Sequence, residues 1–171
     1  MPFYRPTRIE PVPLRLIGDA VDLIVVVLGT IMISLMFINV LARAALNVDV
    51  AANVELGELI LVWATFLGCA AAARRSAHMR ITELLDTMPE RLRRLVELVT
   101  RAGVMIILML LVWNGAQIAH QSMEQQTSVL YWPVGWTYAA LPVGAAFTLL
   151  FVAWETWRIG CGEQVLDTSE I

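Results

Sequence analysis

The chain contains 171 residues, which is the size of a single domain. Hydrophobic residues make up 58 % of it and charged residues 16 %, whereas a typical soluble domain has about 45–50 % and about 25 %. A soluble domain of this size cannot bury so much apolar surface and leave so little charge for its exterior, so the composition excludes that class and predicts a protein embedded in lipid. The net charge of −3 identifies no partner, because in a membrane protein the placement of charge matters more than its sum.

The first half of the chain contains two apolar runs that predict membrane spans. Residues 23–42 carry no charge, and at about 1.5 Å per residue they cover about 30 Å, the thickness of the hydrocarbon core. The second run, residues 59–73, is long enough to cross when it is extended back to Glu55, with charged end residues reaching the interface. We therefore expect spans at about residues 20–42 and 55–74. The first run begins too late and is too long for a signal peptide, so no cleavable leader is expected.

The stretch between the second and third spans is rich in arginine and amphipathic. Its apolar residues recur at the i, i+3, i+4, i+7 spacing of one helical face, in two sets that Pro89 separates. Proline suits the first turn of a helix, so it marks the start of the second set. We predict interfacial amphipathic helices over about residues 79–101, with their apolar faces toward lipid or a partner. The two sets are Ile81, Leu84, Leu85 and Met88, and Leu92, Leu95, Val96 and Val99.

Two further spans are expected at about residues 102–123 and 133–154. The first of these contains no Asp, Glu, Lys or Arg, and aromatic residues gather at both ends of the second, as they do at the two interfaces of a bilayer. Pro142 lies inside the fourth span, where it removes one helix hydrogen bond and is expected to bend the helix. The predicted fold is an all-α integral membrane protein, with four transmembrane helices in a single membrane domain, residues 1–171, plus interfacial amphipathic helices between spans two and three.

The distribution of arginine predicts the orientation, since all 12 positively charged residues are arginines. With four spans, three N-terminal arginines, seven in residues 74–101 and one in the C-terminal tail share one side, and the other side has only Arg43. The positive-inside rule then places both termini and the long loop, residues 74–101, in the cytoplasm. Three or five spans split the arginines far less cleanly.

The sequence offers no recognisable active site. It contains no glycine-rich phosphate loop, no metal-ligand spacing and no nucleophile–base constellation. A haem held by two histidines is the nearest enzyme-linked arrangement, but His78 and His120 are expected on opposite sides of the membrane, about 30 Å apart. We therefore expect no catalytic residue, metal or cofactor. The two cysteines, Cys69 and Cys161, are expected at different depths and unpaired.

Polar and small residues within the spans indicate helix packing. Asn114, Gln117 and Gln121 form a polar row on the outer half of span three, and they either line a transport pathway or form hydrogen bonds with another helix. The second interpretation is favoured because no intramembrane carboxylate or arginine accompanies them. Span two carries a small-xxx-small row that permits close packing of helices. This row is Ala64, Gly68 and Ala72.

From span two onward the sequence resembles a known family. It has an acidic start, a tryptophan, Phe-Leu-Gly followed by small residues, and an arginine and a histidine before the amphipathic segment. The residues are Glu55-x-x-Glu58, Trp63, Phe66-Leu67-Gly68-Cys69-Ala70-Ala71-Ala72, Arg74-x-x-x-His78-x-Arg80-Ile81, Leu84, Leu85, Pro89, Pro133 and Leu141-Pro142-x-Gly144. This pattern resembles the small membrane subunit, the Q-type or dicarboxylate-transport small permease, of tripartite ATP-independent periplasmic (TRAP) transporters. Arg80-Ile81-Thr82 departs from it, since the family more often has a hydrophobic residue and then Val-Asp.

The resemblance implies a non-catalytic subunit of a transporter. In such systems a periplasmic binding protein delivers a solute to two membrane components, and the large permease carries the substrate and sodium sites and moves as an elevator. The small subunit is implied to be its stationary scaffold, in sodium-driven uptake of a solute such as an organic acid, without ATP. The implied partners are the large permease, the binding protein and membrane lipids, and no nucleic acid.

The candidate site residues form three groups. One is a subunit interface, one is a cytoplasmic interface or lipid-headgroup contact whose alternative is ordinary topology-setting charge, and one is an ion pair at the outer side. They are, in that order, Trp63, Ala64, Gly68, Ala72, Asn114 and Gln117; Arg74, Arg75, His78 and Arg80; and Arg43 with Glu55 or Glu58. The short outer loops, residues 44–57 and 124–132, are candidates for contact with the binding protein.

Two other functions remain open from the sequence. A membrane anchor of a respiratory or other redox complex predicts a haem absorption band on the purified protein. A small carrier or exporter that acts alone predicts transport by this chain in proteoliposomes, but such a carrier usually needs central ligands and an internal repeat, and the sequence contains neither.

Overall fold

The computed structural model describes residues 12–46, 51–76 and 90–160, and almost all of them are helical. Four long helices dominate: α1 (Val12–Leu46), α2 (Ala51–Ser76), α4 (Glu90–Gln121) and α6 (Ala140–Gly160). A 3-10 turn, η1 (Ser122–Glu124), and the short helix α5 (Gly135–Tyr138) lie between α4 and α6. No strand occurs in these ranges, so the predicted all-α fold is confirmed.

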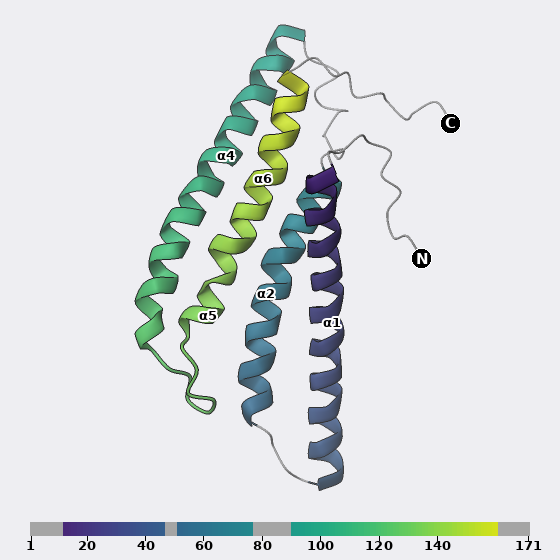
Figure 1. The fold of residues 1–171 in the computed structure, drawn as a ribbon, viewed down its shortest axis with the longest axis vertical. Helices are drawn as coiled ribbons and strands as arrows, with labels where there is room; N and C mark the ends of the chain where they lie inside the picture. Colours follow the sequence, from purple (N-terminus) through teal and green to yellow (C-terminus); the bar gives the residue numbers. More distant parts are fainter. Residues whose placement is uncertain (1–11, 47–50, 77–89, 161–171) are drawn as a thin grey trace, which may run out of the picture.

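The four long helices stand side by side in a row (Figure 1). The helix α1 packs on α2, α2 on α6, and α6 on α4, so that α1 and α4 form the two edges. The first turns of α1 and α4 lie at the same end as the last turns of α2 and α6, which we call the inner end, and the opposite helix ends form the outer end. This arrangement follows the order of the predicted spans.

All four long helices are long and apolar enough to cross a membrane. The candidate spans are Leu14–Ala45, Ala52–Arg74, Leu98–Glu124 and Gly135–Trp157, and only 6–22 % of each apolar window is buried within the chain. Most of the apolar surface therefore faces outward, as a membrane helix requires.

Small residues and a regular apolar seam bring the helices together. On α1, Leu14 and Val21 are seven residues apart and buried against α2, the spacing of a seam between two long helices. Between α2 and α6, a Cβ added at Gly144 would overlap the backbone of Phe66, so only glycine allows this crossing. Gly115 of α4 likewise faces Leu141 of α6.

The helix α4 begins earlier than the expected third span. The residues predicted as the second amphipathic helix, 90–101, are the first turns of α4 and continue without a break into the span. No glycine or proline lies between Pro89 and Gly103 to end a helix there. The first predicted amphipathic helix, over residues 81–88, lies outside the described residues.

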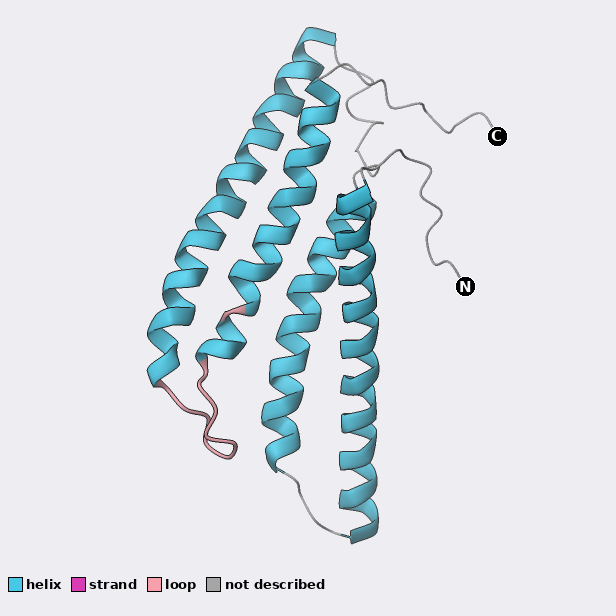
Figure 2. Cartoon of the chain, in the orientation of Figure 1, coloured by secondary structure: helices cyan, strands magenta, loops and turns pink. Residues whose placement is uncertain are grey.

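Proline interrupts the last helix where it can form no hydrogen bond. Pro142 has no N–H to donate to the carbonyl of Tyr138, and the helix is broken at Ala139, between α5 and α6 (Figure 2). Hydrogen bonds from Ala139 N to Gly135 O and from Val143 N to Ala139 O bridge the break.

Candidate functional site

A buried arginine joins α1 to α2 at the inner end. The guanidinium Nη1 of Arg74 lies 3.1 Å from Oδ1 of Asp19, to which it donates a hydrogen bond, and 3.7 Å from Oδ2 of Asp22. The Arg74 side chain is 4 % exposed. Asp19 and Asp22 are one helical turn apart on α1, so both carboxylates reach the same guanidinium.

Glycine on α1 makes room for this guanidinium. A Cβ at Gly18 would overlap the guanidinium of Arg74, which packs directly against the backbone of α1. Arg15, one turn before Asp19, adds a weaker ion pair with a separation of 3.9 Å between two half-exposed side chains. We call Gly18, Asp19, Asp22 and Arg74 the inner anchor.

The other pair of helices has a polar contact at the same end. Nη1 of Arg101 on α4 donates to Oγ1 of Thr156 on α6, with a distance of 3.4 Å. Arg74, predicted as a contact for a cytoplasmic interface or lipid headgroup, and Arg101, counted only among the topology-setting charges, therefore each join neighbouring helices.

A carboxylate on α2 holds the loop at the outer end. Oε1 of Glu55 accepts a hydrogen bond from the backbone N–H of Val129 (2.8 Å), and Oε2 accepts one from Leu130 (2.9 Å). Hydrogen bonds to a charged acceptor are stronger than those between neutral groups, and two of them fix the orientation of the loop.

The loop that Glu55 binds, residues 125–134, is itself a tight hairpin. Val134 N donates to Gln125 O, and Thr127 N donates to Trp132 O, both over 2.8 Å. Tyr131 turns the chain with a φ of 54°, a left-handed conformation that is unfavourable for a non-glycine residue. We call Glu55 and this loop the outer clamp.

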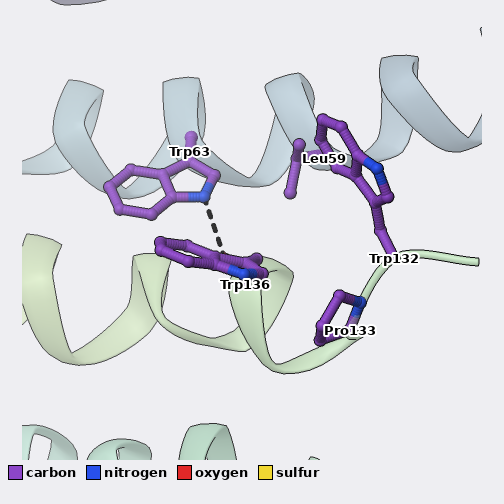
Figure 3. A pocket seen from close by; sticks show the side chains of 5 residues that line it. All are labelled: Leu59, Trp63, Trp132, Pro133 and Trp136. Atoms are coloured by element: carbon purple, nitrogen blue, oxygen red, sulfur yellow. Dashed lines mark hydrogen bonds between the residues drawn. The ribbon is translucent and has the colours of Figure 1, made fainter. Parts of the chain in front are cut away.

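An open apolar cavity of about 340 Å³ lies beside the outer clamp (Figure 3). Trp63 of α2 points toward α5, and its Nε1 donates to the backbone carbonyl of Trp136 over 3.0 Å. Leu59, Trp132 and Pro133 complete the lining. Tryptophans with an apolar ring and a polar N–H are typical of the membrane interface, so the lining of this cavity suits a position near the end of the candidate spans.

Of the residues predicted to form a subunit interface, some contact neighbouring elements of this chain and others are exposed. Trp63 is half-buried and bonded within the chain. Ala64 is half-buried, Ala72 is exposed, and a Cβ at Gly68 would meet nothing within 4 Å, so no described helix packs closely against Gly68. Asn114 and Gln117 are exposed on α4.

The predicted cytoplasmic and outer-side groups are only partly described. Arg74 is buried in the inner anchor, whereas the side chain of Arg75, and all of His78 and Arg80, lie outside the described residues. Glu55 bonds the loop, and both Glu58 and Arg43 are exposed. The ion pair between Arg43 and one of these glutamates stays a prediction.

Sequence reasoning missed the partners of Arg74 and Glu55 on α2. Asp19 and Asp22 lie three residues apart, near the same end of the predicted spans as Arg74. An ion pair with Arg74 could have been predicted from this spacing. The backbone N–H groups of Val129 and Leu130 gave no such signal. Every residue except proline has a backbone N–H, so the sequence does not show which of them bonds a carboxylate. Among the described residues, no group of three or more His, Cys, Asp or Glu side chains is placed to hold a metal ion.

These features define a class of protein. Four apolar helices in a row, joined at their ends by polar contacts and exposing apolar faces, are those of a multi-pass α-helical membrane protein.

Comparison with known proteins identifies the family. The family model described as "Tripartite ATP-independent periplasmic transporters, DctQ component" matches residues 32–161. The small permease protein SiaQ of a sialic acid TRAP transporter from Vibrio cholerae is 26 % identical over 133 residues, which cover 78 % of this chain and 77 % of SiaQ. The chain therefore belongs to the DctQ family, the small permease components of TRAP transporters.

A larger protein also contains a similar region. The permease protein SiaT of a sialic acid TRAP transporter from Haemophilus influenzae is 25 % identical over 145 residues, which cover 82 % of this chain but only 24 % of SiaT. In that relative, a region similar to this chain is part of a much longer permease polypeptide.

Proposed function

We propose that this chain is the small, non-catalytic subunit of a TRAP transporter and that it scaffolds a large, elevator-type permease. The two would take up a solute, driven by a sodium gradient, after a periplasmic binding protein has delivered it. The observation that carries the proposal is the similarity to about a quarter of SiaT, because a chain that resembles one part of a longer permease is suited to binding the remainder as a separate subunit.

The described structure supports a scaffold. The buried Arg74 and the half-buried Arg101 join helices to one another, and its cavity of about 340 Å³ has an apolar lining with an open side. A carrier acting alone needs central ion or substrate ligands, and the described helices place no metal-binding cluster there. The named relatives are components of sialic acid transporters, which favours an organic acid as the solute.

The orientation belongs to the same proposal. The inner end, where the buried Arg74 and the Arg101 contact lie, faces the cytoplasm, and the clamp at Glu55 faces the periplasm, as the excess of arginine on one side favours. The protein resides in the bacterial inner membrane with both termini cytoplasmic. A fluorescent protein fused to the C-terminus should then fluoresce, and alkaline phosphatase fused there should be inactive.

Reconstitution tests the function. Proteoliposomes with this chain, the large permease and the binding protein should accumulate the solute under an inward sodium gradient, and omission of any one component should lower uptake at least tenfold. Uptake that persists unchanged without this chain, or that this chain catalyses alone, contradicts the proposal. Replacing sodium by potassium tests the coupling ion separately.

A further inference from the structure

The outer half of α4 carries three hydrogen-bonding side chains that face away from the rest of the chain. Trp113 is 68 % exposed, and Asn114 and Gln117 are also exposed. At 3.6 residues per turn they lie on the side of α4 turned away from Gly115 and Ala119, which are buried against the neighbouring elements. Because α4 forms an edge of the row (Figure 1), none of the other long helices that the structure describes covers this side.

These side chains lie at a depth where lipid satisfies no hydrogen bond. Asn114 and Gln117 precede the end of α4 at Gln121 by seven and four residues, or about 10 Å and about 6 Å along the axis. Both fall within the apolar span Leu98–Glu124. Trp113 lies deeper than the interfacial tryptophans around the cavity, where a tryptophan N–H usually finds water or headgroups.

Their hydrogen-bonding capacity is largely unused. Asn114 donates through Nδ2 to Leu110 O, 2.9 Å away on its own helix. Gln117 and the indole N–H of Trp113 make no hydrogen bond within the described part of the chain. A primary amide in hydrocarbon is costly unless another protein group bonds it.

The opposite edge of the row differs in this respect. On α1, the exposed hydroxyls of Thr30 and Ser34 are each satisfied by their own helix, through Val26 O and Thr30 O, both over 2.8 Å. The large side chains around them, such as Ile33 (72 % exposed), are apolar. The exposed face of α1 is thus compatible with lipid, whereas the exposed face of α4 carries polar side chains that need a protein partner for their hydrogen bonds.

We propose that the face of α4 formed by Trp113, Asn114 and Gln117 binds the large permease, through a transmembrane helix that presents hydrogen-bonding groups to these side chains. This rests on the proposed function, which supplies the partner: the similarity to part of a longer permease favours a different membrane protein over a second copy of this chain. Gly103 lies on the same side of α4, and a Cβ there would meet nothing within 4 Å, so a partner helix can approach closely.

Photo-crosslinking tests the surface in the intact complex. With benzoylphenylalanine in place of Trp113 and a tagged permease co-expressed, ultraviolet light should yield an adduct of this chain with the permease. The matched position is Ile33 on the α1 edge, which is equally exposed and should yield at least tenfold less. An adduct of two copies of this chain, or permease adducts equal to or fewer than those from position 33, overturns the proposal.

A second measurement tests the hydrogen-bonding side chains directly, by substitution with natural amino acids. The double variant Asn114→Leu and Gln117→Leu should leave the thermal stability of the isolated chain unchanged or raised but lower the amount of co-purified permease at least tenfold. The control Thr30→Val with Ser34→Ala should co-purify the permease as the unmodified chain does. Undiminished co-purification by the leucine variant overturns this inference alone, whereas failure of the unmodified chain to bind the permease overturns the proposed function as well.

Discussion

The two ends of α2 are both held by a charged side chain, but the two charges have different surroundings. At the inner end, Arg74 is buried and pairs with the carboxylates of Asp19 and Asp22. At the outer end, Glu55 is half-buried and accepts hydrogen bonds from the neutral amides of Val129 and Leu130. One anchor joins two helices, and the other joins a helix to a loop.

We expect the inner anchor to stabilise the α1–α2 pair and the outer clamp only to position the loop. A buried guanidinium that loses its carboxylates leaves an uncompensated charge, so disruption of the inner anchor should destabilise the whole α1–α2 pair. An outer carboxylate that loses its amides is exposed to water and headgroups, so disruption of the outer clamp should free only the loop. The predictions that follow address this contrast, beginning with the largest expected effect.

Arg74→Met should be the most destabilising of these substitutions. It removes the buried charge and leaves Asp19 and Asp22 facing each other one turn apart, at a cost of about 2–4 kcal/mol, somewhat less than the about 3–5 kcal/mol of a fully buried pair because Asp19 is 56 % exposed. The free energy of unfolding of the purified chain, from detergent or thermal titration, measures the loss.

The control for Arg74 is Arg15→Met. It removes the same charge from a half-exposed pair with Asp19, so the expected change is below about 0.5 kcal/mol. Equal losses in the two variants contradict a special role for burial. Arg74→Lys should fall between them, because an ammonium keeps the charge but cannot span two carboxylates in the same geometry.

The middle of α2, between the inner anchor and the outer clamp, packs closely against Gly144 of α6. Gly144→Ala should cost about 1–3 kcal/mol, because its Cβ would overlap the backbone of Phe66, which cannot rotate away. Gly68→Ala is the matched control: its Cβ meets open space, and the gain in helix propensity should stabilise the isolated chain by up to about 1 kcal/mol. The same unfolding titration compares them, and a loss in both variants would show that the open space at Gly68 is misassigned.

The fold was predictable because hydrophobicity and charge act over long segments. Twenty uncharged residues at 23–42 have no alternative to a spanning helix, and the clustering of arginine fixes which helix ends lie together. The break at Ala139 also follows from one residue, Pro142, whose ring removes a particular hydrogen bond. A helix start at Pro89 was expected, but its continuation into the third span as one helix was not, because amphipathicity does not distinguish an interfacial helix from an extension of a spanning one.

The site was less predictable because it depends on distances between helices. A sequence places Arg74 near an interface but does not determine whether it points to headgroups or to Asp19 on a neighbouring helix. Likewise the sequence singled out Gly68 as part of a small-residue row, yet a Cβ there meets open space, whereas one at Gly144 would overlap the backbone of Phe66 at a helix crossing. The family, in contrast, was recognised from the span-two pattern that begins at Glu55, and the family match over residues 32–161 confirms it.

Glu55→Ala should loosen the outer loop without unfolding the chain. The two hydrogen bonds to the loop amides are lost, a local cost of about 1–3 kcal/mol. Hydrogen exchange of the Val129 and Leu130 amides should therefore become about 10- to 100-fold faster, while amides in the middle of α2 keep their protection. Glu58→Ala, at an exposed position one turn away, is the control. If it speeds exchange of the Val129 and Leu130 amides by the same factor, the claim that Glu55 specifically holds the loop is rejected.

Trp63→Phe should have the smallest effect and sharpens the contrast between the two ends. The substitution removes the N–H that bonds the carbonyl of Trp136 and part of the cavity wall, but it keeps an aromatic ring, so the expected loss is about 0.5–1.5 kcal/mol. Trp154→Phe provides the comparison, because the buried Nε1 of Trp154 has no hydrogen-bond partner within the described residues. Both substitutions replace an indole by a phenyl ring, and a larger loss of unfolding free energy for Trp63→Phe is expected because only Trp63 donates a hydrogen bond to a neighbouring element. An equal or smaller loss contradicts a stabilising role for the bond between α2 and α5.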